Sequence, residues 1–224
     1  MRNLCCTAIY FSLKEGLNGV DFDWEQPSNR SEYNAYAHLL TEASDILHRE
    51  GLLVTLAIHP GQIFPRDVYE HIDKIHLMTY DMLDQPDTHH ASFASSFKAV
   101  ELLIDSGCDP SKIVLGLPVY SRNKKDSSRV KTYSEVVESF FKQTGNGQSL
   151  DHDLVELSEF GGFPLESQVL VRRKIQQAVE KRLAGVFVWE IGQDYRSKAY
   201  PSGLLLHYIS VAFRAANNKR LDEL

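Results

Sequence analysis

Three carboxylates stand on alternate residues near the start of the chain, at Asp21, Asp23 and Glu25. Apolar residues separate them, so a β-strand would place all three carboxylates on one face, roughly 6.6 Å from one to the next. Like charges this close repel, and sharing protons among them drives their pKa values apart. A carboxyl group kept protonated near neutral pH in this way can act as a general acid.

Two other interpretations of this run are an inert, solvated strand face and a calcium-binding loop. A loop of the EF-hand type requires glycine at its sixth position, and counting from Asp21 that position holds Gln26. The calcium interpretation therefore fails. The solvated face stays open as the alternative to a catalytic site.

The run from Asn18 to Glu25 resembles the D-G-x-D-x-D-x-E signature of family 18 glycoside hydrolases, the chitinases and their relatives. Asn18 stands where the signature has its first Asp, and the other acidic positions are filled. The resemblance implies a TIM (β/α)8 barrel that hydrolyses β-1,4 N-acetylglucosamine linkages in chitin or chito-oligosaccharides.

The elements that would position these residues follow from the hydrophobic pattern. Short apolar runs alternate with amphipathic stretches, which predicts an α/β fold with parallel strands covered by helices. The expected strands are Gly19–Trp24, Leu52–Ile58, Lys74–Met78, Ile113–Pro118 and Gly185–Trp189. The expected helices are Ser31–Arg49, Phe93–Ser106, Glu166–Leu183 and one that leads from the N-terminus into the first strand.

Polar or aromatic residues follow every expected strand, which is where a TIM barrel carries its active site. In strand order they are Glu25, His59, Tyr80 with Asp81, Tyr120 and Trp189. The segment 121–165 between the last two strands is long and polar, which indicates a loop or insertion.

A closed barrel requires eight βα units, whereas about five can be recognised here. Compared with the family, the chain begins in the helix before the fourth strand, so residues 1–224 are expected to form one partial catalytic domain with strands 4 to 8. Open sheet edges would make this domain dependent on the missing strands or on a partner. A fragment of a longer protein is the preferred interpretation.

Two later segments resemble further motifs of the family. Residues 78–81 match its M-T-Y-D segment, and residues 116–122 match G-x-P-x-Y-G-R, with Ser121 in place of a glycine. Taken alone, Tyr80 could equally be a core ring whose hydroxyl finds a backbone partner. Trp189 lies in a run similar to the family's eighth strand, where the Trp forms the floor under the reactive sugar, whereas Trp24 is expected to pack into the helix layer.

The resemblance implies a retaining, substrate-assisted mechanism, in which the substrate's own N-acetyl oxygen attacks the anomeric carbon. Glu25 would be the acid and base, Asp23 would orient the acetamido group, and Asp21 would share a proton with Asp23. Tyr80 would hydrogen-bond the acetamido oxygen. The implied substrate-binding residues are Asp81, Met78, Tyr120, Trp189 and Arg122.

No metal or organic cofactor is required by this chemistry, and the nine histidines show no zinc-ligand spacing such as H-E-x-x-H. Three cysteines without a C-x-x-C pair argue against a disulfide framework. A net charge of −6 argues against a nucleic-acid partner. No apolar run approaches the roughly 18 residues of a membrane span. The expected partner is an N-acetylglucosamine-containing polysaccharide or oligosaccharide.

Neither terminus carries a convincing targeting signal. The first 13 residues favour a helix over a signal peptide, and Leu221 breaks the resemblance of the C-terminus to an ER-retention tail. Family resemblance implies a secreted or lumenal protein.

Three alternative functions stay open on the sequence. They are a non-hydrolytic, chitinase-like lectin, a related activity such as an endo-β-N-acetylglucosaminidase or cell-wall hydrolase, and an inactive fragment. The presence of Glu25 counts against the lectin, because non-hydrolytic relatives usually lose the acid.

Overall fold

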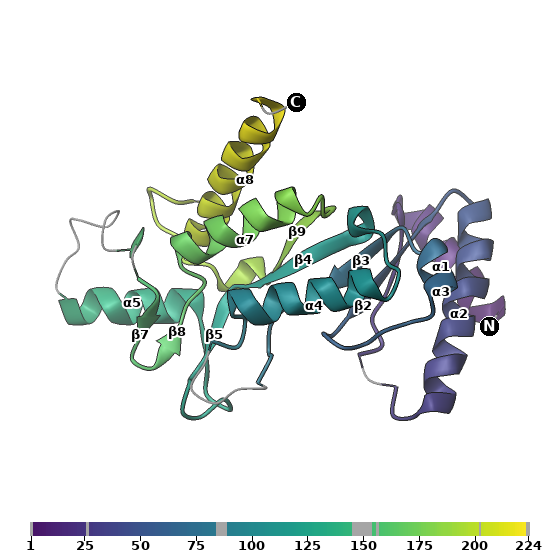
Figure 1. The fold of residues 1–224 in the computed structure, drawn as a ribbon, viewed down its shortest axis with the longest axis horizontal. Helices are drawn as coiled ribbons and strands as arrows, with labels where there is room; N and C mark the ends of the chain where they lie inside the picture. Colours follow the sequence, from purple (N-terminus) through teal and green to yellow (C-terminus); the bar gives the residue numbers. More distant parts are fainter. Residues whose placement is uncertain are drawn as a thin grey trace. The chain divides into compact units, whose positions relative to one another are not determined.

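The structure, a computed structural model, describes residues 2–25, 27–83, 89–144, 154–155, 157–201 and 203–222 (Figure 1). The side chains of residues 2–4, 217 and 219–222 lie outside this description. The chain forms two compact units, one of residues 1–78 and 98–115 and the other of residues 79–97 and 116–224. Each unit is described by itself.

The described strands form an α/β fold around a sheet with the order β1-β2-β3-β4-β9, which confirms the predicted fold class. The five strands are β1 (Gly19–Phe22), β2 (Leu53–Ile58), β3 (Lys74–Leu77), β4 (Ile113–Pro118) and β9 (Gly185–Trp189). The pairs β1–β2, β2–β3 and β3–β4 are parallel. The first half of β4 belongs to the first unit and its second half to the second unit.

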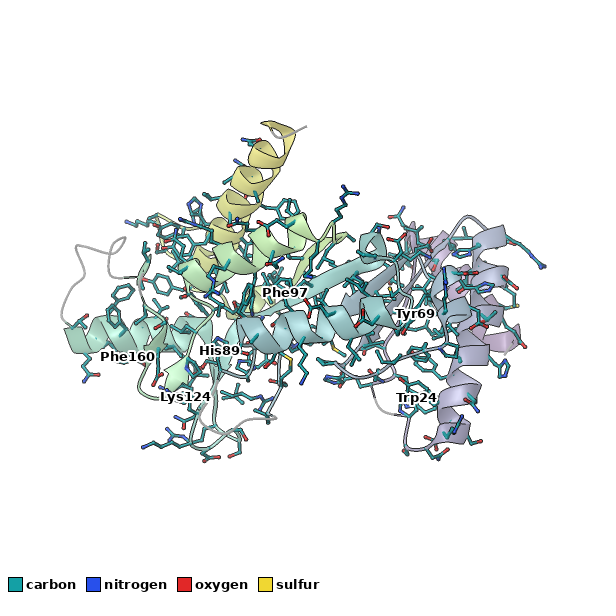
Figure 2. All side chains as sticks on the ribbon, in the orientation of Figure 1. Trp24, Tyr69, His89, Phe97, Lys124 and Phe160 are labelled. Atoms are coloured by element: carbon teal, nitrogen blue, oxygen red, sulfur yellow. The ribbon has the colours of Figure 1, made fainter. Side chains whose placement is uncertain are left out.

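Helices of the first unit pack on its strands. They are α1 (Arg2–Glu15), α2 (Arg30–Arg49), the short α3 (Arg66–Glu70), the second half of α4 (Phe93–Asp105) and the 3-10 turn η1 (Pro110–Lys112). Asn29 caps α2 by accepting a hydrogen bond from the Glu32 amide, and Tyr36 and Leu40 on this helix are almost fully buried. Trp24 and Tyr69, labelled in Figure 2, both belong to this unit.

β1 ends at Phe22, two residues earlier than the sequence predicted. Its register with β2 runs from Gly19 opposite Leu53 to Phe22 opposite Leu56. Beyond that point the Trp24 amide donates a hydrogen bond to the Tyr36 hydroxyl at 3.4 Å, and the Trp24 ring packs against the Tyr36 ring. Trp24 therefore turns toward the helix layer as predicted, although it is 40% exposed.

The second unit contains the predicted loop segment 121–165. The described part of this segment holds secondary structure, whereas residues 145–153 and 156 lie outside the described residues. Its elements are β5 (Tyr120–Arg122) paired antiparallel with β6 (Val130–Thr132), α5 (Tyr133–Thr144), and β7 (Glu159–Phe160) paired antiparallel with β8 (Phe163–Pro164). A single partial domain over residues 1–224 stays a prediction.

The C-terminal part of the second unit packs α7 (Gln168–Glu180) against β9 and against α8 (Leu204–Asp222), with the 3-10 turn η2 (Ile191–Gln193) between β9 and α8. Figure 1 shows α7 and β9, both light green, side by side. Asp194 is buried and accepts hydrogen bonds from the Leu205 and Leu206 amides, each at 3.0 Å. It therefore caps α8, a structural role that the sequence did not predict.

Lys174 on α7 forms a completely buried ion pair with Glu166. Its ammonium group also donates a hydrogen bond to the Ala91 carbonyl oxygen at 2.7 Å. Both charged side chains are fully inaccessible to solvent, an uncommon arrangement because burying a charge is costly unless it is paired.

Candidate active site

The candidate residues fall in both units. The first unit holds Asp21, Asp23, Glu25 and Met78, and the second holds Tyr80, Asp81, Tyr120, Arg122 and Trp189. The carboxylates gather at the C-terminal end of β1, and four of the others are linked by contacts around Asp81.

Asp21 is held by neighbouring strands of the sheet. It lies opposite Thr55 in the register, accepts a short hydrogen bond from the Thr55 hydroxyl, and lies 3.0 Å from His76 Nδ1. Burial alone would raise the pKa of Asp21, but the contacts with His76 and Thr55 outweigh it and lower the pKa overall. Asp21 is therefore held as the carboxylate.

The pKa of Asp23 is raised, opposite to that of Asp21. Partial burial raises its pKa, the negative charges of Glu25 and Asp21 raise it further, and His59 opposes them. The pKa values of Asp21 and Asp23 thus move in opposite directions. This difference favours a proton on Asp23 rather than on Asp21.

Glu25 lies beyond β1, so strand alternation does not set its orientation. Its Oε2 lies 2.9 Å from Nε2 of His59, the first residue after β2. Gln62 accepts a hydrogen bond from the His59 amide at 2.6 Å and donates one to the Trp24 carbonyl oxygen at 3.4 Å. The turn that follows β2 therefore holds the segment that carries Glu25.

In the second unit, Asp81 is the centre of a polar cluster. Arg122 binds it with two hydrogen bonds, from Nε to Oδ1 at 2.5 Å and from Nη2 to Oδ2 at 2.7 Å. The Asp81 amide donates to His90 Nδ1 at 3.1 Å, and Asp81 has a positive φ of 56°. Such a backbone conformation is unfavourable for a residue with a side chain, and these contacts offset its cost.

Aromatic rings line the same cluster. The Tyr80 ring lies 6.1 Å from the Tyr120 ring and 6.2 Å from the Phe187 ring, and the His90 ring lies 5.0 Å from the Tyr120 ring at a tilt of 38°. Tyr80 and Tyr120 are only 5% and 7% exposed, so their rings contribute to packing as well. Burial, and then Asp81, raises the pKa of Tyr120, which keeps its hydroxyl protonated.

The last two candidates differ in exposure. Trp189 is 53% exposed at the end of β9, and its carbonyl oxygen accepts a hydrogen bond from the Val119 amide at 2.7 Å. Met78 is only 6% exposed, directly after β3. An exposed indole can stack on a sugar, whereas the Met78 side chain lies largely within the core.

Asp81 gives a testable dependence of stability on pH. Burial alone would raise its pKa, but hydrogen bonds with Arg122 and His90 outweigh this and hold the pKa far below its usual range. Since the folded protein then binds fewer protons than the unfolded one, the stabilisation is present above the unfolded pKa of about 3.9 and is lost as the pH falls below it. We expect Asp81→Asn to be less stable than wild type at pH 6, with the two curves converging toward pH 2.5 in urea unfolding.

Arg122→Gln removes the partner instead of the carboxylate and should reduce the same acid-dependent loss of stability. Parallel curves for the wild type and Asp81→Asn would show that this carboxylate does not couple stability to pH.

Several partners of the candidate residues were not predicted. The sequence predicted no contacts for His59, His76, His90 or Thr55, although it placed His59 after the second expected strand. Over the described ranges, no group of three or more His, Cys, Asp or Glu side chains is arranged to hold a metal ion, and no helix is both long and apolar enough to cross a membrane.

Comparisons with known proteins all indicate the same family. The model of the glycosyl hydrolases family 18 matches residues 3–194. Probable chitinase 2 of Drosophila melanogaster is 27% identical over 237 residues, which cover 82% of this chain and 49% of that protein. Nod factor hydrolase protein 1 of Medicago truncatula is 24% identical, with 80% of this chain and 58% of that protein covered. This chain thus spans about half to three fifths of these relatives.

Solved structures share the fold at lower identity. The Ostrinia furnacalis Group IV chitinase in complex with allosamidin has a TM-score of 0.77 at 21% identity, and 96% of this chain and 73% of that chain are covered. A chitinase-like agglutinin from Robinia pseudoacacia has a TM-score of 0.71 at 22% identity, with coverage of 93% and 71%. Together with the β1 carboxylates and the family match over most of its length, these likenesses establish that the chain belongs to family 18 of the glycosyl hydrolases.

Proposed function

We propose that this chain hydrolyses β-1,4 N-acetylglucosamine linkages in chitin or chito-oligosaccharides, with Glu25 as the acid and base. The observation that carries the proposal is the carboxylate cluster at the end of β1, where the pKa of Asp21 is lowered and that of Asp23 is raised. Two carboxyl groups with opposite shifts can hold one proton in a defined place beside a third.

The mechanism we propose is the retaining, substrate-assisted one that the family resemblance implies. Glu25 donates its proton to the leaving glycosidic oxygen while the substrate's N-acetyl oxygen closes on the anomeric carbon. Asp23 orients the acetamido N–H and stabilises the positive charge that develops, and Asp21 tunes the charge of Asp23. Glu25 then removes a proton from the water that opens the cyclic intermediate.

The residues of the second unit take their roles from the motifs they match. Tyr80 would hydrogen-bond the acetamido oxygen, and Trp189 would support the sugar ring. Asp81, Tyr120 and Arg122 supply a polar and aromatic surface that suits a sugar's hydroxyl groups and C–H faces. Met78, largely buried, would contact substrate only at its edge.

A solved structure supports the proposed substrate class. A plant class V chitinase mutant from Cycas revoluta, whose structure has a TM-score of 0.74 to this chain, was crystallised in complex with (GlcNAc)3. Secretion is proposed on similar grounds, since the relatives include Secreted chitinase LysM12 of Penicillium expansum, 25% identical over 54% of this chain.

The proposal is tested by incubating the chain with chitohexaose and following the products by proton NMR. The β-anomer should appear first, because a retaining reaction preserves the configuration of the cleaved bond. Release of the α-anomer first would overturn the mechanism. Saturable binding without cleavage would instead support the lectin alternative. If chitohexaose were neither cleaved nor bound, the proposed function would be overturned.

His59 gives a prediction for the same reaction. His59→Leu removes the 2.9 Å contact with Glu25 and should lower kcat about 10- to 100-fold, since misplacing a reacting group is costly, with little change in KM. His59→Gln keeps a side-chain donor and should retain more of the activity. Steady-state kinetics on a fluorogenic N,N′-diacetylchitobioside measure both. Equal kcat in all three proteins would show that His59 does not position Glu25.

A further inference from the structure

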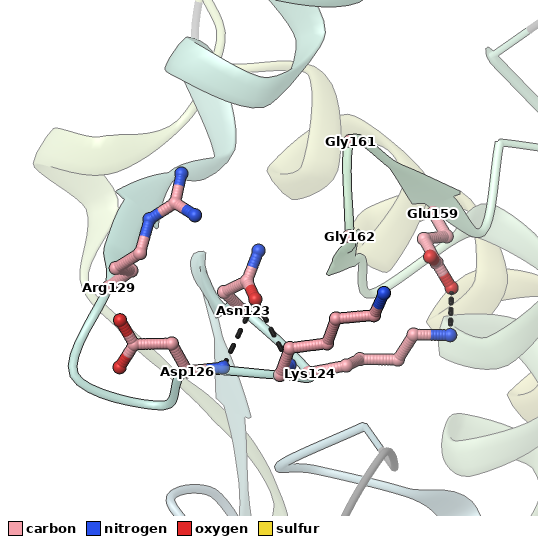
Figure 3. Close-up of a pocket in the computed structure, with 8 residues that line it drawn as sticks. Asn123, Lys124, Asp126, Arg129, Glu159, Gly161 and Gly162 are labelled. Atoms are coloured by element: carbon pink, nitrogen blue, oxygen red, sulfur yellow. Dashed lines mark hydrogen bonds and ion pairs between the residues drawn. The ribbon is translucent and has the colours of Figure 1, made fainter.

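A polar pocket lies on the second unit, on residues that carry none of the proposed catalytic roles (Figure 3). Its volume is about 630 Å³, within the range of small-molecule sites. It is lined by the loop after β5 and by the turn between β7 and β8, with the residues Asn123, Lys124, Lys125, Asp126, Arg129, Glu159, Gly161 and Gly162.

Asn123 forms a buried donor on this pocket, at 7% exposure. Its Oδ1 accepts hydrogen bonds from the backbone amides of Lys125 at 3.0 Å and Asp126 at 3.2 Å. These two bonds fix which end of the amide is oxygen, because an NH2 group could not accept them. The NH2 group consequently points into the space between Arg129 and the Gly161–Gly162 turn (Figure 3).

The Gly161–Gly162 turn lies close to this amide. Both glycines have positive φ, 60° and 83°, which suits the tight turn of a β-hairpin. A Cβ at Gly162 would lie 2.9 Å from Asn123 Nδ2, closer than real Cβ contacts. Glycine at this position lets the turn lie against the NH2 group of Asn123 without a steric clash.

The charges around the amide favour an anion. Lys124 is paired with Glu159 at 2.6 Å, and the Asp126 carboxylate accepts hydrogen bonds from the Ser128 amide and hydroxyl. Among the residues that the structure describes, Lys125 and Arg129 form no ion pair with a carboxylate. The Arg129 guanidinium lies over the Phe163 ring, 5.6 Å from its centroid, and, after the hydrogen bonds from Ser128, its charge helps to lower the pKa of Asp126. The lining thus carries three cations against two carboxylates, on a chain with a net charge of −6.

We propose that this pocket binds an oxyanion carried by a saccharide, such as a sulfate ester or a uronate carboxylate. Asn123 would donate to the oxyanion from the floor, with Lys125 and Arg129 supplying the charge-assisted hydrogen bonds. The pocket is large enough for a sugar ring as well as its anionic group, and its lining lacks the aromatic side chains on which nucleic-acid bases stack.

The assignment to a sugar rests on the proposed function, because the loop that lines the pocket continues directly from Arg122. Arg122 binds Asp81 and also donates to the Ser127 carbonyl oxygen within this loop, at 3.1 Å. An acidic substituent on a bound glycan would therefore find a binding group next to the polar cluster of the same unit.

The test compares ligands by isothermal titration calorimetry on the whole chain: a sulfated heparin-derived tetrasaccharide, chitotetraose and inorganic sulfate. We expect the sulfated tetrasaccharide to bind at this pocket at least tenfold more tightly than inorganic sulfate, and its affinity to fall as salt is added. Asn123→Asp keeps the acceptor for the two backbone amides but replaces the NH2 donor with a carboxylate oxygen. It should weaken binding of the sulfated sugar at least tenfold and leave chitotetraose unaffected.

The double variant Lys125→Gln/Arg129→Gln should weaken binding similarly. The control Lys142→Gln/Arg172→Gln, which also removes one lysine and one arginine charge but from exposed sites on α5 and α7, should not weaken it. Equal weakening in both doubles would mean non-specific attraction and overturn the site. Equal affinity for inorganic sulfate, or for a single-stranded oligonucleotide, would overturn the sugar assignment. Since hydrolysis of chitohexaose is read separately, binding without hydrolysis would reject the proposed function and retain the site.

Discussion

We expect Glu25→Gln to lower kcat for chito-oligosaccharide hydrolysis by about 10²- to 10⁴-fold while saccharide binding stays within a few-fold of wild type. Glutamine has nearly the same shape and can still contact His59, but it has no proton to give to the leaving oxygen and cannot take one from water. Release of a fluorogenic aglycone measures turnover, and calorimetry with chitotetraose measures binding.

Glu42→Gln is the matched control, since Glu42 is an exposed carboxylate on α2 in the same unit. It should leave turnover unchanged. If Glu25→Gln retained more than a tenth of the wild-type kcat, Glu25 would not be the acid. A loss of turnover that came with a loss of cooperative unfolding would instead show that the substitution acts on folding, which circular dichroism distinguishes.

The elements that carry these residues could be predicted because the chain repeats two simple periods. The strands β4 and β9 have the bounds that the sequence predicted, and α2 differs by one residue at its start. Each is a short apolar run or a long amphipathic stretch. The predicted end of β1 was wrong by two residues. The alternation of apolar and acidic residues continues through Glu25, whereas the pairing with β2 stops at Phe22.

The partners of the carboxylates could not be predicted, because they depend on register and turn geometry rather than on local pattern. Asp21 meets Thr55 only because Gly19 lies opposite Leu53. Glu25 meets His59 only because Gln62 closes the turn after β2. The motif thus predicted a cluster of carboxylates, whereas the opposite pKa shifts of Asp21 and Asp23 depend on neighbours that only the fold supplies.

The second large effect concerns stability rather than chemistry. We expect Lys174→Met to lower the free energy of unfolding by about 3–5 kcal/mol, because it leaves Glu166 buried without its partner. Burial already raises the pKa of Glu166 and lowers that of Lys174, so neither group can be kept charged alone without a large cost. Urea unfolding followed by circular dichroism measures the loss. Arg172→Met, an exposed position on the same helix, should have little effect.

The double variant Lys174→Met/Glu166→Leu separates a stranded charge from lost packing. Replacing both partners with apolar side chains should recover most of the stability, since the unpaired carboxylate is gone and only the contact with the Ala91 carbonyl oxygen is lost. In the single variant, stability should rise as the pH falls from 8 to 5, because a carboxyl group with a raised folded pKa is cheapest when protonated. A single variant whose stability is independent of pH, and a double variant no more stable than the single, would assign the cost to packing instead of charge.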